Sequence, residues 1–129
     1  MPEVVITSIE GRHLDLSQGE DEGEPWTFTA RLVTEHGDVV SSVCNYLSNP
    51  STFFRSLAAD WRGWEGERSW NSLERELEIT ALHDGKGLIA CEVSLGSNIP
   101  PTWRLAAEMT FGAGAHMEEI ASALEAAGL

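Results

Sequence analysis

The chain has 129 residues, of which 42% are hydrophobic and 22% are charged. This length and composition are typical of one globular domain covering residues 1–129, and they exclude an extensively disordered chain. The 21 acidic residues outnumber the 8 basic ones, giving a net charge of −13. Such a charge repels phosphates and anionic lipids, so it argues against nucleic acid and membrane surfaces as partners. A simpler explanation of this net charge is that it only keeps the protein soluble.

Residues 1–13 contain no basic segment followed by a long apolar run, and no stretch of about 18 apolar residues occurs anywhere. We therefore expect a cytoplasmic protein. Cys44 and Cys91 fall in strand-like segments without CxxC or Cys/His spacing. They are expected to be reduced thiols, and a disulfide between them is the minor alternative.

The first hairpin is predicted at the N-terminus, where residues 4–9 and 12–16 are rich in strand-forming side chains and flank Gly11. Residues 17–25 follow and carry four carboxylates. A solvated loop is the favoured interpretation of that run, with an acidic contact for a basic partner or a weak cation site as alternatives.

A second hairpin is predicted from a clear alternation in residues 26–33. One face of this strand would carry Trp26, Phe28, Ala30 and Leu32. The turn at residues 35–38 contains the glycine that a tight hairpin favours, and residues 39–47 return as the partner strand.

A helix is predicted next, with Ser51 as its N-cap and its end at Gly63 and Gly66. Its apolar residues recur at helical spacing and would form a buried stripe: Phe54, Leu57, Ala58 and Trp61. The stretch from residue 53 to residue 93, which starts with this helix, reads as the structural centre of the chain.

Two further tryptophans, Trp64 and Trp70, flank the turn after the helix. They predict either a packed lid over the core or an exposed contact surface, and the lid is favoured. The contact interpretation stays open because Trp beside Glu65 and Glu67 resembles the residue mixture of interface anchors.

An acidic stripe is predicted on the following strand, residues 73–83, with Leu73, Leu77, Ile79 and Ala81 inward. Its outward face would carry Glu74, Glu76 and Glu78. The next strand, residues 88–95, adds only Glu92 on the outward face and no compensating cation. The stripe is a candidate contact for a basic partner; the alternative is a solvated face that discourages edge pairing.

The last strand and the last helix complete the predicted fold. Residues 103–111 alternate strictly, and the helix after residue 115 has a buried stripe of Met117, Ile120, Ala121 and Leu124. The element order β-β-β-β-α-β-β-β-α predicts an α+β fold: an antiparallel sheet of about six or seven strands with two helices on one face.

Catalytic and cofactor motifs are not recognisable. The four histidines are scattered, and neighbouring His83 and Asp84 would point to opposite faces of a strand. Gly112 and Gly114 lack the third glycine of a dinucleotide loop. We expect no enzyme activity, no metal and no cofactor.

Residues 61–66 read Trp-Arg-Gly-Trp-Glu-Gly, and Trp70, Ser72, Leu73 and Glu74 follow them. This stretch resembles a family of small actinobacterial proteins of unknown function. From Trp26 onward, the order of hairpin, short helix, Gly-containing turn, strands and C-terminal helix is also similar to immunity proteins of the WapI type. That second resemblance implies protection of a cell from a contact-delivered toxin, by binding and not by catalysis.

The leading hypothesis is therefore a non-catalytic cytoplasmic binding protein. It would act as an immunity protein that neutralises a basic toxin through an acidic surface. Its candidate partner-binding residues are Trp64, Glu65, Glu67, Trp70, Glu74, Glu76 and Glu78. The alternative is a self-associating structural or regulatory domain, a homodimer instead of a monomer. An enzyme would require polar groups converging from Arg62, His83 and Asp84.

Overall fold

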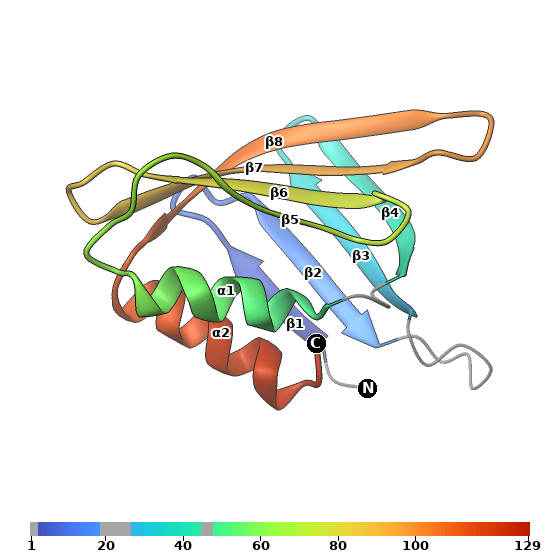
Figure 1. Ribbon diagram of the computed structural model, residues 1–129. Coiled ribbons are helices and arrows are strands. Elements are labelled where there is room, and N and C mark those ends of the chain that lie inside the picture. The colour runs from blue at the N-terminus through green and yellow to red at the C-terminus, as the bar shows by residue number, and fades with distance from the viewer. Residues whose placement is uncertain (1–2, 19–26, 45–47) are drawn as a thin grey trace.

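The computed structural model describes residues 3–18, 27–44 and 48–129 and contains two antiparallel sheets and two helices in this part of the chain (Figure 1). The elements, in order, are β1 (Glu3–Thr7), β2 (His13–Gln18), β3 (Thr27–Thr34), β4 (Gly37–Cys44), α1 (Pro50–Ala59), β5 (Arg68–Asn71), β6 (Leu77–His83), β7 (Leu88–Ser97), β8 (Trp103–Gly112) and α2 (Ala115–Ala126). The α+β class is confirmed. The predicted single sheet of six or seven strands is wrong, because eight strands divide into two four-stranded sheets.

The N-terminal sheet consists of β1 to β4 in sequence order, so both predicted hairpins are confirmed. Its alternation places Phe28, Ala30 and Leu32 in the core and their neighbours outward. The turn between β3 and β4 uses Gly37 at a φ of 131°, where a side chain would be strained. Trp26, most of the predicted acidic loop at residues 17–25, and the end of the strand at residues 39–47 lie outside the described residues.

The C-terminal sheet consists of β5 to β8, again in sequence order. Its first strand, β5, was not predicted, because its four residues lie inside the Trp-rich turn and are too few to show alternation. The predicted strand at residues 73–83 is shorter than expected: β6 begins at Leu77. Residues 72–76 form a turn instead, which is closed by a hydrogen bond from the Arg75 N–H to the Ser72 carbonyl at 3.0 Å.

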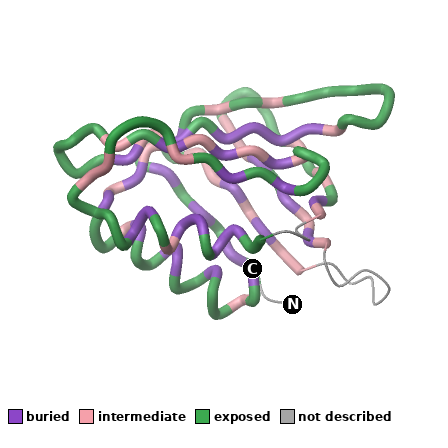
Figure 2. Tube along the Cα trace, in the orientation of Figure 1, coloured by how far each residue is buried: buried purple, intermediate pink, exposed green. Residues whose placement is uncertain are grey.

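One hydrophobic core joins both sheets and both helices. Figure 2 shows buried positions alternating along the strands of each sheet and following one side of each helix. β7 packs across β4 and β3, while α1 and α2 lie side by side along the molecule (Figure 1). The predicted stripe of α2, formed by Met117, Ile120, Ala121 and Leu124, is fully confirmed as buried. Neither helix of the described chain is long and apolar enough to cross a membrane.

Helix α1 differs from the prediction at both ends. Asn49 occupies the N-cap, and Pro50 takes the first helical position, where its missing N–H has no cost, so Ser51 lies inside the helix and is buried. The helix ends at Ala59, one turn earlier than expected. Trp61 therefore lies beyond the helix and is 51% exposed, outside the core stripe.

Candidate functional site

The two tryptophans of the predicted contact differ in environment. Trp70 is buried and donates its indole N–H to the Ser48 hydroxyl at 2.9 Å, so it is a core residue. Trp64 is half-buried and packs against the core. The Arg68 guanidinium lies 4.6 Å from the centroid of the Trp64 ring, and the His83 ring makes a T-shaped contact with it at a centroid distance of 5.3 Å. Both side chains fit the lid interpretation more closely than that of a protruding anchor.

The predicted acidic stripe does not exist as one strand face, because only Glu78 lies in a strand. Glu74 is in the preceding turn and exposed. Glu76 turns inward: its carboxylate accepts from the Ser72 hydroxyl at 2.6 Å and from the Cys44 N–H at 3.3 Å. This contact joins the turn to β4 of the other sheet, so Glu76 has a structural role that its sequence context could not reveal.

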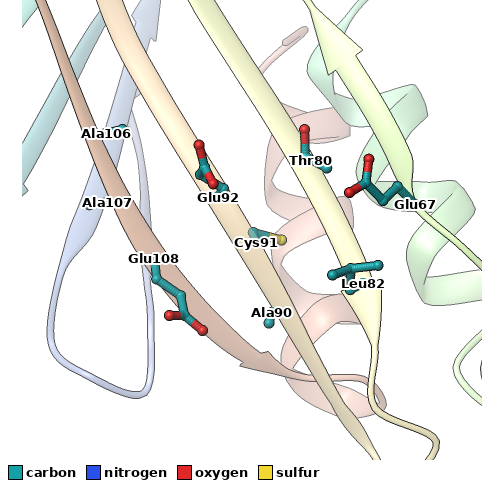
Figure 3. Close-up of a pocket in the computed structure, with 9 residues that line it drawn as sticks. All are labelled: Glu67, Thr80, Leu82, Ala90, Cys91, Glu92, Ala106, Ala107 and Glu108. Carbon is teal, nitrogen blue, oxygen red and sulfur yellow. The ribbon is translucent and has the colours of Figure 1, made fainter.

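Carboxylates gather instead on the outer face of the C-terminal sheet. A depression of about 440 Å³ is hollowed there across β6, β7 and β8 (Figure 3). It is lined by Glu67, Thr80, Leu82, Ala90, Cys91, Glu92, Ala106, Ala107 and Glu108. Figure 3 shows the three glutamates on separate segments: Glu67 before β5, Glu92 on the middle strand β7 and Glu108 on β8. We call this surface, defined by Glu67, Glu92 and Glu108, the acidic sheet face.

Glu92 and Glu108 lie directly opposite each other on β7 and β8. The Glu108 carbonyl accepts a hydrogen bond from Arg12, and the Thr110 carbonyl accepts one from the Ile9 N–H. Both carbonyls therefore point away from β7. Glu92 and Glu108 therefore form a pair without mutual backbone hydrogen bonds, the type in which side chains approach most closely. Two like charges in that position destabilise a sheet.

The acidic sheet face has no ion-pair partner within the described chain. Within the described residues, no ion pair and no hydrogen bond is made by the carboxylates of Glu67, Glu92 and Glu108. Arg12 attracts the charge of Glu108 and donates to its backbone carbonyl at 2.7 Å, but its other nitrogens bond to the Glu35 carboxylate. That bond lowers the pKa of Glu35 to about 2. The acidic sheet face thus retains charge that an external cation could neutralise.

The sequence partly indicated this surface. It placed Glu92 on an outward face and named Glu67 as a contact, but Glu108 was missed. The missing signal was strand register, because only the pairing of β7 with β8 sets Glu108 opposite Glu92.

The groups that an enzyme would have required do not converge. His83 accepts from the Gly85 N–H at its Nδ1, so its Nε2–H donates to the Trp61 carbonyl at 2.9 Å. Backbone N–H groups of Leu88 and Lys86 hold the Asp84 carboxylate and lower its pKa. The Arg62 guanidinium stacks on the Trp61 ring, 4.9 Å from its centroid. Each group has a local structural partner.

Within residues 3–18, 27–44 and 48–129, no group of three or more His, Cys, Asp or Glu side chains is arranged to hold a metal ion. Cys44 and Cys91 are free thiols, as predicted. The described residues present a concave acidic surface on the C-terminal sheet.

A family model described as "Family of unknown function (DUF6228)" matches residues 11–127. The chain belongs to this family. The predicted membership of a family of unknown function is thereby confirmed at that level. Neither the curated proteins nor the solved structures contain a match. The DUF6228 match spans nearly the whole described fold, including the acidic sheet face.

Proposed function

We propose that this DUF6228 protein is a non-catalytic cytoplasmic protein that binds a basic protein through the acidic sheet face. The observation that carries the proposal is the Glu92–Glu108 pair, which has no ion-pair partner in the described chain and lies with Glu67 at a depression on the outer face of the sheet. A lysine or arginine of a partner would relieve the repulsion within the pair. The net charge of −13 would steer such a partner toward the protein.

The geometry suits a contact surface for a folded partner. The depression is shallow and open to solvent, and Leu82 beside it is 47% exposed, which adds apolar area to a charged surround. Interfaces combine a small apolar centre with a polar rim in this way. Together with the similarity to WapI-type immunity proteins in element order, this supports a protein that covers a basic toxin.

The test compares two variants with the same change in net charge. The first, E67Q/E92Q/E108Q, removes the acidic sheet face; the matched control, E65Q/E74Q/E125Q, removes three exposed glutamates from other positions. Each is used to capture basic proteins from the lysate of the native host at low and at high salt. Three surface ion pairs of about 0.5 kcal/mol each correspond to roughly tenfold in affinity.

We expect the sheet-face variant to bind a captured basic protein about tenfold more weakly and with less salt dependence, while the control binds like wild type. We also expect the sheet-face variant to unfold at a higher temperature, because the like-charge pair is gone. Equal binding by both variants would contradict the proposal. Light scattering on the same samples tests the alternative, because a strict monomer rules out the homodimer.

A further inference from the structure

Strand β1 forms one edge of the N-terminal sheet, and half of its backbone groups point away from the sheet. The Ser8 N–H donates to the Arg12 carbonyl across the hairpin, so the backbone N–H and C=O groups of Ser8 point toward β2. By alternation, the backbone groups of Ile6 and Val4 point the same way. The backbone N–H and C=O groups of Glu3, Val5 and Thr7 must then point outward, away from the sheet. The Thr7 carbonyl confirms this, since it accepts the Nε2–H of His116 in α2.

This outward edge is open over most of its length. His116 accepts from the Gly112 N–H at Nδ1 and closes the Thr7 end of the edge. Across the described residues, no partner meets the N–H and C=O groups of Val5 or the N–H of Thr7. Val5 itself is 54% exposed. β1 also lacks the lysine or proline that commonly protects a sheet edge from pairing.

Two other sheet edges have backbone partners at some of their positions. The β8 edge is covered by the β1–β2 turn, through bonds from Ile9 and Arg12 to backbone carbonyls and from Thr110 to the Glu10 carboxylate. At β4, the Cys44 N–H and carbonyl bond to the turn before β6. The β1 edge differs because α2 runs beside it and leaves room.

Two depressions line the space between β1 and α2, with volumes of about 340 and 290 Å³. On the α2 side, the first depression is lined by Ala123, Ala126 and Ala127, and the second by His116, Glu119, Ile120 and Ala123. An extended segment could therefore lie along β1, with its outer side chains beside Glu3 and Val5 and its inner side chains over the alanines of α2.

Charge decides which segment fits. Glu3 on β1 and Glu119 on α2 flank the space, and no lysine or arginine lines it. Arg31 of the same sheet attracts Glu3, but neither glutamate forms an ion pair in the described chain. A basic segment would form favourable cross-strand charge pairs there. A second copy of this chain would not, because a two-fold pairing about Val5 sets Glu3 opposite Thr7 and joins two chains of net charge −13.

We propose that the β1 edge is a docking site for an extended basic segment of another protein, which adds a fifth strand to the N-terminal sheet beside α2. The segment accepts from the Val5 and Thr7 N–H groups and donates to the Val5 and Glu3 carbonyls. It carries lysine or arginine at alternate positions. This site is separate from the acidic sheet face.

The probe is the synthetic peptide acetyl-Lys-Thr-Lys-Val-Lys-Thr-Lys-amide, with a peptide in which glutamate replaces each lysine as the charge control. Amide hydrogen exchange measured by NMR locates the bound peptide residue by residue. We expect exchange at Val5 and Thr7 to slow by about fivefold or more with the basic peptide, and no change with the acidic one.

Two variants at opposite edges of the same sheet sharpen the test. V5P removes an outward N–H from β1, and V40P makes the matched change on β4, where Val40 is 52% exposed. V5P should weaken peptide binding about fivefold or more, and V40P should leave it unchanged. E3K/E119K should weaken it as well, which keeps the proposal testable if V5P does not fold.

Slowing confined to β4 or to the acidic sheet face would overturn the proposal, as would equal binding by wild type and V5P. Protection of β1 in the free protein together with a dimeric mass would assign the edge to a second copy and also overturn it. E67Q/E92Q/E108Q should retain the β1 signal. Loss of the β1 signal and loss of the proposed sheet-face function are therefore distinguishable.

Discussion

The two thiols illustrate how burial sets chemistry at the scale of single residues. Cys91 is 1% exposed on the inner face of β7, and burial raises the pKa of its thiol to about 12. Cys44 is half-buried at the end of β4. Because the thiolate is the reactive form, the two cysteines should differ widely in reactivity.

We expect iodoacetamide at pH 8 to modify Cys44 in the native protein and to leave Cys91 unmodified over the same time, as followed by peptide mass spectrometry. In urea both thiols should react alike, because burial is lost. Similar rates for the two thiols in the native state would show that Cys91 is accessible.

At the scale of elements, the β1–β2 turn holds the N-terminal sheet to the C-terminal sheet. The Glu10 carboxylate accepts from the Thr110 N–H at 2.8 Å and from its hydroxyl at 2.5 Å. Partial burial alone would raise the pKa of Glu10, but these hydrogen bonds outweigh it and lower the pKa from 4.5 to about 2. The folded state therefore favours the charged form of Glu10.

This lowered pKa has a defined consequence for stability. A depressed carboxyl pKa contributes stability that is fully present above about pH 4.5 and is lost as the pH falls toward 2. E10Q should lower the free energy of unfolding by about 0.5–1 kcal/mol at pH 7, the scale of exposed charge-assisted bonds. The difference between wild type and E10Q should shrink as the pH falls, as measured by urea unfolding.

The matched control for this prediction is E65Q, since Glu65 is exposed and makes no hydrogen bond or ion pair within the described chain. It should show no such pH-dependent difference. If the difference in unfolding free energy between wild type and E10Q stays constant from pH 7 to pH 2, the assigned role of the Glu10 carboxylate is contradicted.

At the scale of the whole molecule, one core joins two sheets that are separate in sequence. Leu57 of α1 is fully buried in that core. α1 also packs on α2. Arg55 of α1 forms ion pairs with two glutamates of α2, Glu118 at 2.5 Å and Glu125 at 2.6 Å. Loss of packing at α1 should therefore affect both sheets together.

L57A should destabilise the protein by about 2–5 kcal/mol, as large-to-small core substitutions do. Unfolding followed by tryptophan fluorescence and by far-UV circular dichroism should remain one coincident transition. The control L82A, at a side chain that is 47% exposed, should stay within about 0.5 kcal/mol of wild type. Two separate transitions in L57A would show that the sheets unfold independently.

Local patterns determined much of this fold. Alternation in β3 and β7 and the helical spacing in α2 gave the correct inward residues, because the periods of strand and helix are properties of the backbone itself. The charge of −13 likewise belongs to the composition and needs no structure. Both hairpins of the N-terminal sheet followed from short-range turn chemistry.

Contacts between distant segments were decided only by the tertiary structure. The division into two sheets, the inward turn of Glu76 toward Cys44 and the opposition of Glu92 to Glu108 all depend on which strands pair and in what register. Period-two alternation assigns a residue to a face but not to a neighbour, since many pairings bury the same side chains. The acidic sheet face and the open β1 edge are therefore properties of the folded chain that the sequence pattern alone could not supply.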